Sequence, residues 1–454
     1  MQNPSQTSGH ARTYRIAIYA LGLLACALIG DGWVANALGG GVTLLALALY
    51  MLEDPKFFRL VLMWCAGFLL IIVPEGLSDA TIIKRLYGAA SYDIASRCLV
   101  ASHFAMLLGH DLVFKESDVR PSATPWRLAL RFAVPILAIT WVLSMLYVLP
   151  TAILSYRGGR AAQGAITQAS ALGAVADGLS LVARVAVPVA SIWVAKRVRG
   201  PARTLLLGMV AISLATEVLF STRFVLLFVT VGCLVARTAP RPPTRRMMGA
   251  LLALALVLVV TSTVLTQTRT FGLRTANVGQ VVETASAEQL FTLNEQSVRS
   301  MTQAVVYARR RGFTDGRTSA ALLVFWVPRA LWPSKPKLIG YWLPREFGKI
   351  DEGFSSAPGF TGGTYVDFGL WGSVVAWFMI GLVFGGLERM CARVLAGKED
   401  ARVLLVAPLF GGVFFAVRSP ETATLSLVGV MLATLLFQVL VGRRRLVRAA
   451  GTSV

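Results

Sequence analysis

The sequence predicts an all-α polytopic membrane protein, and three observations support that class. Apolar runs of about 20 residues, the length that crosses the hydrocarbon core of a bilayer, recur along the 454-residue chain. Hydrophobic residues make up 56% of the chain, and its mean hydropathy is +0.66. Arg and Lys gather in one set of the short connections between the runs, as the positive-inside rule requires.

We expect about twelve transmembrane helices, and the ends of the apolar runs set their approximate boundaries. The predicted spans are 13–30, 33–52, 57–74, 93–114, 128–150, 172–195, 203–220, 222–237, 247–266, 366–388, 402–418 and 421–441. The connections on one side hold most of the basic residues, so that side faces the cytoplasm. An even number of spans then places both termini in the cytoplasm. The longest connection falls on the opposite side, the periplasm or the cell exterior.

This long connection divides the chain into three regions. They are a transmembrane region with helices 1–9 (1–266), a large outer loop (267–365), and a transmembrane region with helices 10–12 and a cytoplasmic tail (366–454). Within the loop, apolar residues at helical spacing over 287–311 predict an amphipathic helix on the membrane surface. The apolar segment 320–332 is too short to span a bilayer and is broken by Pro328, which favours a re-entrant or interfacial segment.

Basic residues in the outer loop are candidate ligands for a diphosphate. They are Arg329, Lys335, Lys337 and Arg345, together with Arg299 on the predicted amphipathic helix. Proline fixes φ, so the prolines of the 328–336 stretch restrict how the cations beside them are arranged. Arg binds phosphate oxygens with two parallel hydrogen bonds, and Lys adds a point charge. Anchoring to anionic lipid headgroups is the alternative interpretation of the same residues.

Glycines crowd the segment before the tenth predicted span. Gly362 and Gly363, followed by Tyr365, would let backbone N–H groups approach an anion at the start of a helix, so we take these three residues as candidate substrate ligands. A tight turn into the span explains the same glycines equally well.

Ionisable residues inside predicted spans are costly and mark either a cavity or an internal pair. Asp177 and Arg184 lie two helical turns apart on one face, which favours a structural pair. Arg223 begins a span on the outer side and is a candidate catalytic residue. Glu295 and Asp367 are the leading candidates for a general base that would take the proton of an acceptor hydroxyl.

Composition argues against several other functions. The 3 His residues and 5 Cys residues form no cluster that suggests a zinc site or a disulfide framework. The outer loops contain no Asp-x-Asp pair, so no divalent cation is indicated and we expect no metal and no other cofactor. The net charge of +21 comes mostly from Arg that flanks the spans, which argues against nucleic acid as a partner.

Two motifs of the outer loop read Pro328-Arg-Ala-Leu-Trp-Pro-Ser-Lys-Pro336 and Pro358-x4-Gly363-x-Tyr365-x2-Phe368-Gly369-x2-Gly372. In these motifs the chain resembles Wzy-type polysaccharide polymerases, the O-antigen and exopolysaccharide repeat-unit polymerases of bacterial inner membranes. The layout of roughly a dozen spans with one late, large outer loop fits the same family, as does Arg223 after Ser-Thr.

The resemblance implies a GT-C-like glycosyltransferase that acts on undecaprenyl-diphosphate-linked oligosaccharides. In that family the growing chain passes from its lipid carrier to a new lipid-linked repeat unit at the periplasmic face. Carried over to this chain, the resemblance implies that the two diphosphates are bound by Arg223, Arg329, Lys335, Lys337 and Arg345. The implied partners are the donor and acceptor lipids, membrane lipids and a chain-length regulator.

Two other functions remain alternatives at this point. An O-antigen ligase-like enzyme would be expected to use a His in the large outer loop, and this loop has none. A transporter or flippase would be expected to show internal repeats, and the chain shows no internal repeat. Both observations favour the polymerase.

Overall fold

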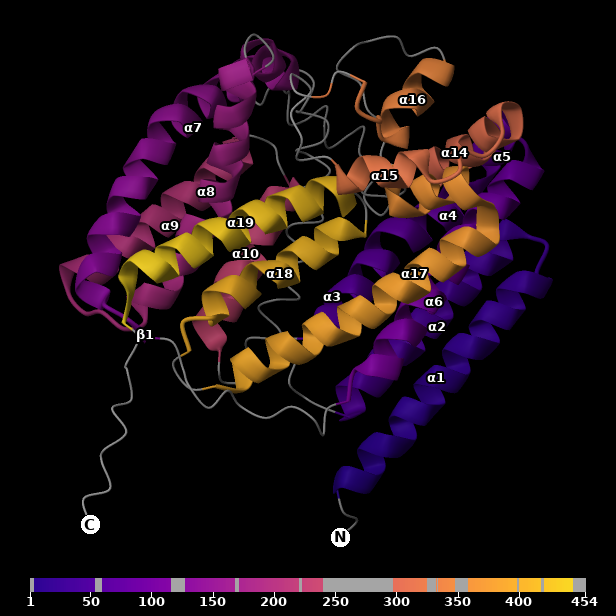
Figure 1. Cartoon of the computed structure of the whole chain (residues 1–454), viewed down its shortest axis with the longest axis horizontal. Coiled ribbons are helices and arrows are strands. Elements are labelled where there is room, and N and C mark those ends of the chain that lie inside the picture. Colours follow the sequence, from indigo (N-terminus) through magenta and orange to yellow (C-terminus); the bar gives the residue numbers. More distant parts are fainter. Residues whose placement is uncertain are drawn as a thin grey trace, which may run out of the picture. The chain divides into compact units, whose positions relative to one another are not determined.

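The computed structural model is almost entirely helical and divides into two compact units, which we describe separately (Figure 1). The first unit comprises residues 1–119, 242–390 and 412–425, and the second comprises 120–241, 391–411 and 426–454. The structure describes residues 4–53, 59–115, 127–167, 171–219, 223–239, 297–324, 332, 334–347, 358–397, 400–417 and 420–443.

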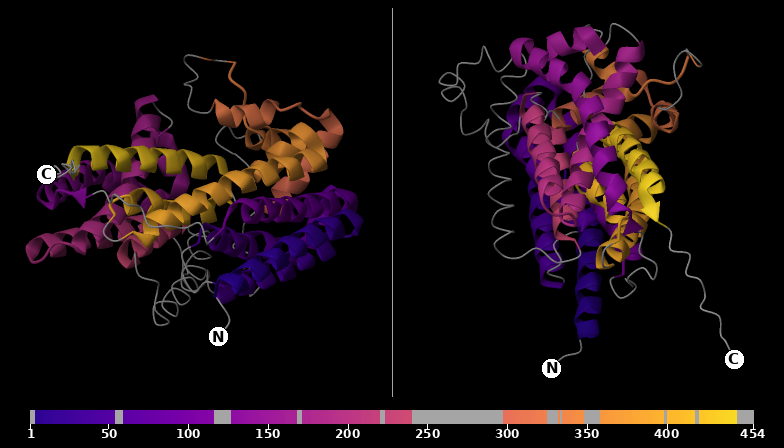
Figure 2. Two further views of the ribbon diagram at one scale, coloured as in Figure 1. Left: turned by 60° about the horizontal axis from the view of Figure 1, so that its bottom comes forward. Right: turned by 90° about the vertical axis from the view of Figure 1, so that its left-hand side faces the viewer.

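The first unit is built around one central helix, α6 (Ala89–Val113). Its packing partners are α1 (Pro4–Leu28), α2 (Gly32–Glu53), α5 (Ala80–Tyr87) and α14 (Ser297–Arg311). α1 and α2 pack against each other and lie side by side in all three views (Figures 1 and 2). The remaining elements are α3 (Leu60–Gly67), a π-helical turn (Phe68–Ile72), α4 (Val73–Ser78), α15 (Arg317–Leu323), α16 (Ile339–Glu346) and most of α17 (Gly359–Ala396).

α6 carries several ionisable residues although its sequence predicts a span. Most of its side chains are buried by the neighbouring helices, so its polar groups find partners inside the protein. The ring of His103, for example, lies 2.9 Å from the Thr43 hydroxyl and accepts a hydrogen bond from the Trp64 indole at 3.0 Å. A helix enclosed in this way needs less apolar surface than one that faces lipid.

The second unit is a helical bundle in which α8 packs against its neighbours α7, α9 and α10. Their bounds are α7 (Leu130–Thr167), α8 (Ala171–Ala195), α9 (Pro201–Leu219) and α10 (Arg223–Thr238). Parts of α18 (Val403–Ala416) and α19 (Pro420–Val441) complete the unit. A two-residue strand β1 (Arg127–Leu128) pairs antiparallel with β2 (Gly442–Arg443) at the end of α19.

Among the described residues, six helices are long and apolar enough to cross a membrane. They are Ala11–Leu28, Gly32–Met51, Leu60–Ser78, Leu130–Leu154, Pro201–Val218 and Gly359–Ala396. Each predicted span except 247–266, which lies outside the described residues, coincides with a helix, although several of these helices are shorter or less apolar than the six. The structure therefore supports a polytopic helical membrane protein, while the count of twelve and the orientation stay predictions.

The amphipathic pattern at 287–311 is helical from Ser297, and its apolar face packs against other helices of the protein. Its apolar side chains Val298, Met301 and Val305 are fully buried against the first unit, where α14 packs on α5, α6 and α16. The carboxylate of Glu75 on α4 accepts hydrogen bonds from the Val298 and Arg299 N–H groups, both at 3.0 Å. A buried carboxylate therefore caps α14 and ties it to the bundle.

α17 begins at Gly359, earlier than the predicted boundary, and folds back on itself at Gly369. Trp377 donates its indole N–H to the Thr361 hydroxyl at 2.9 Å, and the Thr364 and Ser373 hydroxyls lie 2.9 Å apart. In a continuous helix, Thr361 and Trp377 would be about 24 Å apart at 1.5 Å per residue. Residues 359–368 therefore form a short helix that doubles back along the longer helix after Gly369.

The reversal depends on Gly369, whose φ of 72° and ψ of −166° fall in a region that is open almost only to glycine. An added Cβ would also lie 3.3 Å from the Phe313 ring. We expect Gly369→Ala to lower the free energy of unfolding by about 1–3 kcal/mol, measured by thermal or denaturant unfolding in detergent. Gly386→Ala is the matched control, because Gly386 lies in the same helix with open space around its Cβ position. Equal stability of the two variants would contradict the strained turn.

Candidate functional site

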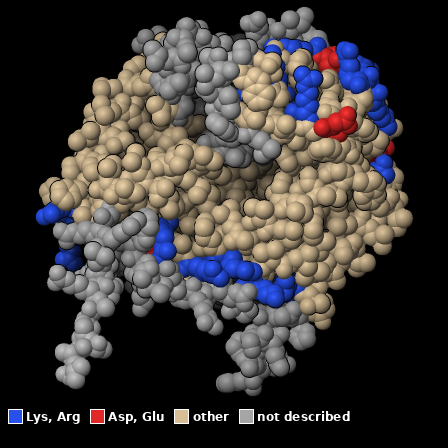
Figure 3. All heavy atoms as spheres, viewed as in Figure 1, with Lys and Arg blue, Asp and Glu red and all other residues tan. Residues whose placement is uncertain are grey.

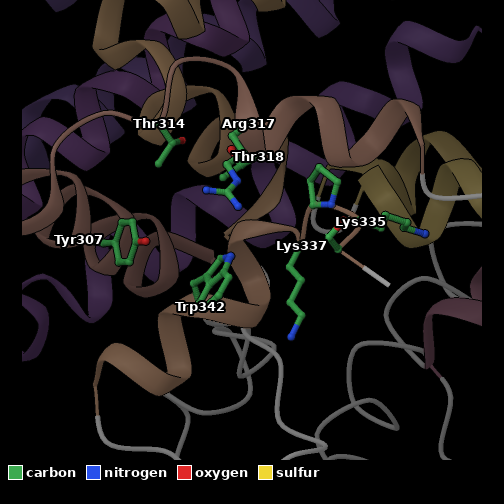
Figure 4. Close-up of a pocket in the computed structure, with 9 residues that line it drawn as sticks. Tyr307, Thr314, Arg317, Thr318, Lys335, Lys337 and Trp342 are labelled. Carbon is green, nitrogen blue, oxygen red and sulfur yellow. The ribbon is translucent and has the colours of Figure 1, made fainter. Parts of the chain in front are cut away.

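A pocket of about 450 Å³ opens in the first unit between α14, the turn before α15, and the segment that leads into α16 (Figure 4). Its lining consists of Tyr307, Thr314, Arg317, Thr318, Ser334, Lys335, Pro336, Lys337 and Trp342. The volume is in the range of small-molecule binding sites. The predicted outer loop contributes every lining residue, and three of them are basic, whereas none of these nine is acidic.

The cations of the pocket differ in how they are held. Arg317 is exposed, and in Figure 4 its guanidinium lies on the same side of the pocket as Tyr307 and Trp342. Lys335 and Lys337 extend in other directions in that view, and their long side chains need only rotamer changes to approach a bound anion. The Lys337 ammonium lies 3.8 Å from the centre of the Tyr341 ring. The pocket thus combines three positively charged side chains with the aromatic rings of Tyr307 and Trp342.

A tight turn delivers Arg317 to the pocket. Asp315 has a φ of 48°, which is uncommon for a residue other than glycine, and Gly316 follows with a φ of 87°. The carboxylate of Asp367 on α17 accepts hydrogen bonds from the N–H groups of Thr318 (3.0 Å) and Ser319 (2.6 Å). These N–H groups belong to the first turn of α15, so Asp367 caps that helix from 48 or more residues away.

Two of the predicted cations, Lys335 and Lys337, are pocket residues, whereas Arg345 and Arg299 are not among its lining. The Arg345 guanidinium stacks on the Tyr341 ring at 3.4 Å and donates to the Tyr341 carbonyl oxygen at 2.7 Å. Arg299 lies two turns before Tyr307 on α14, and its Nε donates to the Tyr87 hydroxyl at 3.3 Å. Both arginines thus contact tyrosine side chains. Arg345 belongs to α16, the helix that also carries the pocket residue Trp342.

The glycine-rich start of α17 does not line the pocket among the described residues. An added Cβ at Gly362 would lie 2.5 Å from the Pro358 side chain. The carbonyl oxygen of Gly363 accepts a hydrogen bond from the Thr318 hydroxyl at 3.0 Å. Tyr365 is 7% exposed and packs edge-on against Phe313. The sequence allows two explanations for these glycines, contact with an anion or a tight turn into the span. The close contacts with protein atoms fit the second explanation better.

Asp367, which the sequence named as a candidate general base, is enclosed by the protein. Its side chain is 1% exposed, and its two oxygens accept three hydrogen bonds, the third from the Thr314 hydroxyl at 2.5 Å. A carboxylate enclosed in this way cannot approach an acceptor hydroxyl in the pocket. Glu295 and Arg329 lie outside the described residues, as does the side chain of Arg223, which begins α10 in the second unit.

Arg184 has a partner on the neighbouring helix in addition to any within its own helix. It forms a two-pronged ion pair with Glu217, which joins α8 to α9 inside the second unit. Both side chains are buried, at 5% and 1% exposed. The side chain of Asp177 lies outside the described residues. The ion pair between Arg184 and Glu217 joins two helices, so the spacing of residues within one helix could not indicate it.

Sequence reasoning also missed Arg317 and Tyr307 as pocket residues. The available signal for Arg317 was the Asp-Gly pair before it, which is typical of a tight turn that exposes the next side chain. Tyr307 lies off the apolar stripe that Val298, Met301 and Val305 form on α14, and nothing in its sequence position marked it as a pocket residue.

Comparison of the chain with protein-family models, curated proteins and solved structures finds no match. In the part of the chain that the structure describes, no group of three or more His, Cys, Asp or Glu residues could hold a metal ion. The geometry of the pocket therefore has to carry any functional conclusion.

Proposed function

We propose that this chain is a membrane glycosyltransferase that polymerises undecaprenyl-diphosphate-linked oligosaccharide repeat units into a surface polysaccharide. The observation that carries the proposal is the pocket with Arg317, Lys335 and Lys337 beside the rings of Tyr307 and Trp342. Basic side chains suit the oxygens of a diphosphate, and aromatic rings suit the apolar face of a sugar. The two loop motifs that resemble Wzy-type polymerases support the same activity.

In the proposed reaction, a hydroxyl oxygen of the acceptor unit forms a bond to the anomeric carbon of the donor sugar. The bond from that carbon to the diphosphate oxygen breaks, so the growing chain moves to the acceptor and the lipid diphosphate leaves with the bonding electrons. Arg317, Lys335 and Lys337 would stabilise the negative charge that develops on the leaving diphosphate. These side chains can supply the charge that a divalent metal provides elsewhere, so we propose a metal-independent reaction.

The acceptor proton needs a base that reaches the pocket. Asp367 is buried and fully hydrogen-bonded, and none of the nine lining residues is a carboxylate. We retain the other carboxylate that the sequence singled out, Glu295, as the proposed general base; it lies outside the described residues. Arg223 is proposed as a further diphosphate ligand on the same side of the membrane, in line with the resemblance.

We place the protein in the bacterial inner membrane with a GT-C-like architecture, both termini in the cytoplasm and the pocket at the periplasmic face. The asymmetry of basic residues between the connections supports this orientation. Figure 3 shows Lys and Arg side chains gathered at the upper right, where α14 and α16 lie in the same view. Such a surface suits anionic lipid headgroups beside the bound substrate.

Deletion of the gene tests the proposal in the cell. We expect a strain without it to display single repeat units on its surface glycan instead of polymer, as seen by gel electrophoresis of the glycan. Full-length polymer that stays on the lipid carrier would instead identify a ligase. Repeat units that stay at the cytoplasmic face would identify a transporter. Complementation with the wild-type gene is the control, because it should restore the polymer ladder.

A further inference from the structure

The loop that carries Arg317 is bound to the folded-back part of α17 at several points. Thr314 donates its hydroxyl to Asp367 Oδ1 at 2.5 Å and its N–H to the Val366 carbonyl at 3.0 Å. The Thr318 and Ser319 N–H groups donate to the two oxygens of Asp367. These contacts lie immediately before and after Arg317 in the chain, so they fix its backbone from both sides.

The backbone of Arg317 is also hydrogen-bonded within this loop, and the bond does not involve its side chain. Its N–H donates to the Thr314 carbonyl oxygen at 3.0 Å, which closes the turn. Arg317 is exposed, and its side chain lines the pocket together with Tyr307 and Trp342. A backbone held in place reduces the conformational entropy that an arginine loses when it binds a ligand.

We propose that Asp367 is a positioning residue, which holds the 314–319 loop so that Arg317 faces a phosphate group bound in the pocket. The short helix 359–368 thus serves as a rigid support for the loop, and the glycine-rich motif is needed to bring Asp367 to it. This inference rests on the proposed function only for the ligand, a diphosphate. It replaces the role of general base that the sequence indicated for Asp367.

Binding of inorganic pyrophosphate to the purified protein in lipid nanodiscs tests the inference, with calorimetry as the readout. We expect Asp367→Asn to weaken binding about tenfold, since an amide cannot accept from all three donors as the carboxylate does. Arg317→Gln should weaken it at least as much. The double variant should bind no more weakly than Arg317→Gln alone, because Asp367 acts through Arg317. Asp315→Asn is the control, since Asn tolerates the positive φ of that exposed site.

Three outcomes would overturn the inference. If Asp367→Asn keeps wild-type affinity and loses only turnover, Asp367 is a base; if it loses only thermal stability, its role is structural. Additive losses in the double variant would mean that Asp367 does not act through Arg317. Hydrogen exchange gives a readout that needs no ligand: the amides of Thr318 and Ser319 should exchange faster in Asp367→Asn, while those of α14 should not. Wild-type protein that binds no pyrophosphate would overturn the proposed function, and the exchange rates would still decide whether Asp367 holds the loop.

Discussion

Replacement of Lys335 and Lys337 together by glutamine is expected to lower the polymerisation rate by about a hundredfold or more. Both residues line the pocket, and glutamine keeps much of their length while it removes two positive charges. Charge that develops on the leaving diphosphate in the transition state would then be stabilised by Arg317 alone among the described lining cations. The measurement is the rate of polymer formation by purified protein in proteoliposomes that contain lipid-diphosphate-linked repeat units.

Arg310→Gln is the matched control for this experiment. Arg310 belongs to α14, as Tyr307 does, but its side chain is 58% exposed and it is not a lining residue of the pocket. Its ion pair with Glu346 is long at 3.8 Å and solvent-exposed, so its loss should change stability by less than about 1 kcal/mol. If the double lysine variant polymerised at the wild-type rate, the pocket would not be the diphosphate site. An equal loss in Arg310→Gln would point to a general effect of surface charge.

The lysines were found from the sequence because their signal is local. They lie among prolines in a loop between apolar spans, and both features can be read from neighbouring residues. The local signal for Arg317, the Asp-Gly pair before it, indicates a turn but not a pocket, and the loop that carries it is hydrogen-bonded to Asp367, 50 residues further along the chain. The sequence singled out Asp367 as a candidate base but could not indicate its burial, because burial depends on how α17 folds back at Gly369.

The same limit applies to the helices. Apolar runs of bilayer length predicted where helices occur, because hydrophobicity over 20 residues is a property of one segment. The surroundings of the apolar face of α14 were not predictable in this way. Its spacing indicated an amphipathic helix correctly, but whether the apolar face meets lipid or protein is decided by Glu75 and α6, which are distant in sequence. The ion pair between Arg184 and Glu217 was not predicted for the same reason, since the two residues lie on different helices.

A network of buried charges in the first unit went unnoticed in the sequence although it is the most enclosed polar cluster we find among the described helices. Asp111 on α6 is fully buried and accepts hydrogen bonds from Arg15 Nε and the Tyr50 hydroxyl, each at 2.7 Å. The ring of His110 lies 2.8 Å from Asp111 Oδ1 and 2.9 Å from Glu388 Oε2 on α17. The network therefore links α1, α2, α6 and α17 through one carboxylate and its neighbours.

Asp111→Asn is expected to destabilise the protein by about 3–5 kcal/mol, because it removes one charge from a buried network and leaves an excess of positive charge at Arg15 and His110. The amide is nearly isosteric, so the loss comes from charge and from donor–acceptor mismatch at Arg15 and Tyr50. Arg15 is only 3% exposed and cannot regain hydration without movement of α1. Denaturant unfolding in detergent micelles measures the effect, and α1 should become accessible to protease at lower denaturant concentration than the rest of the chain.

Asp31→Asn provides the control on the same unit. Asp31 is 51% exposed, and its carboxylate accepts hydrogen bonds from the N–H groups of Trp33 (2.7 Å) and Val34 (3.2 Å) at the start of α2. Asn caps a helix about as well as Asp, so this substitution should change the free energy of unfolding by less than about 1 kcal/mol. If both substitutions changed the free energy of unfolding by similarly small amounts, water would reach Asp111. The buried network would then not stabilise the packing of α1. A large effect confined to Asp111→Asn would establish that α1 is held in the first unit by charge as well as by apolar packing.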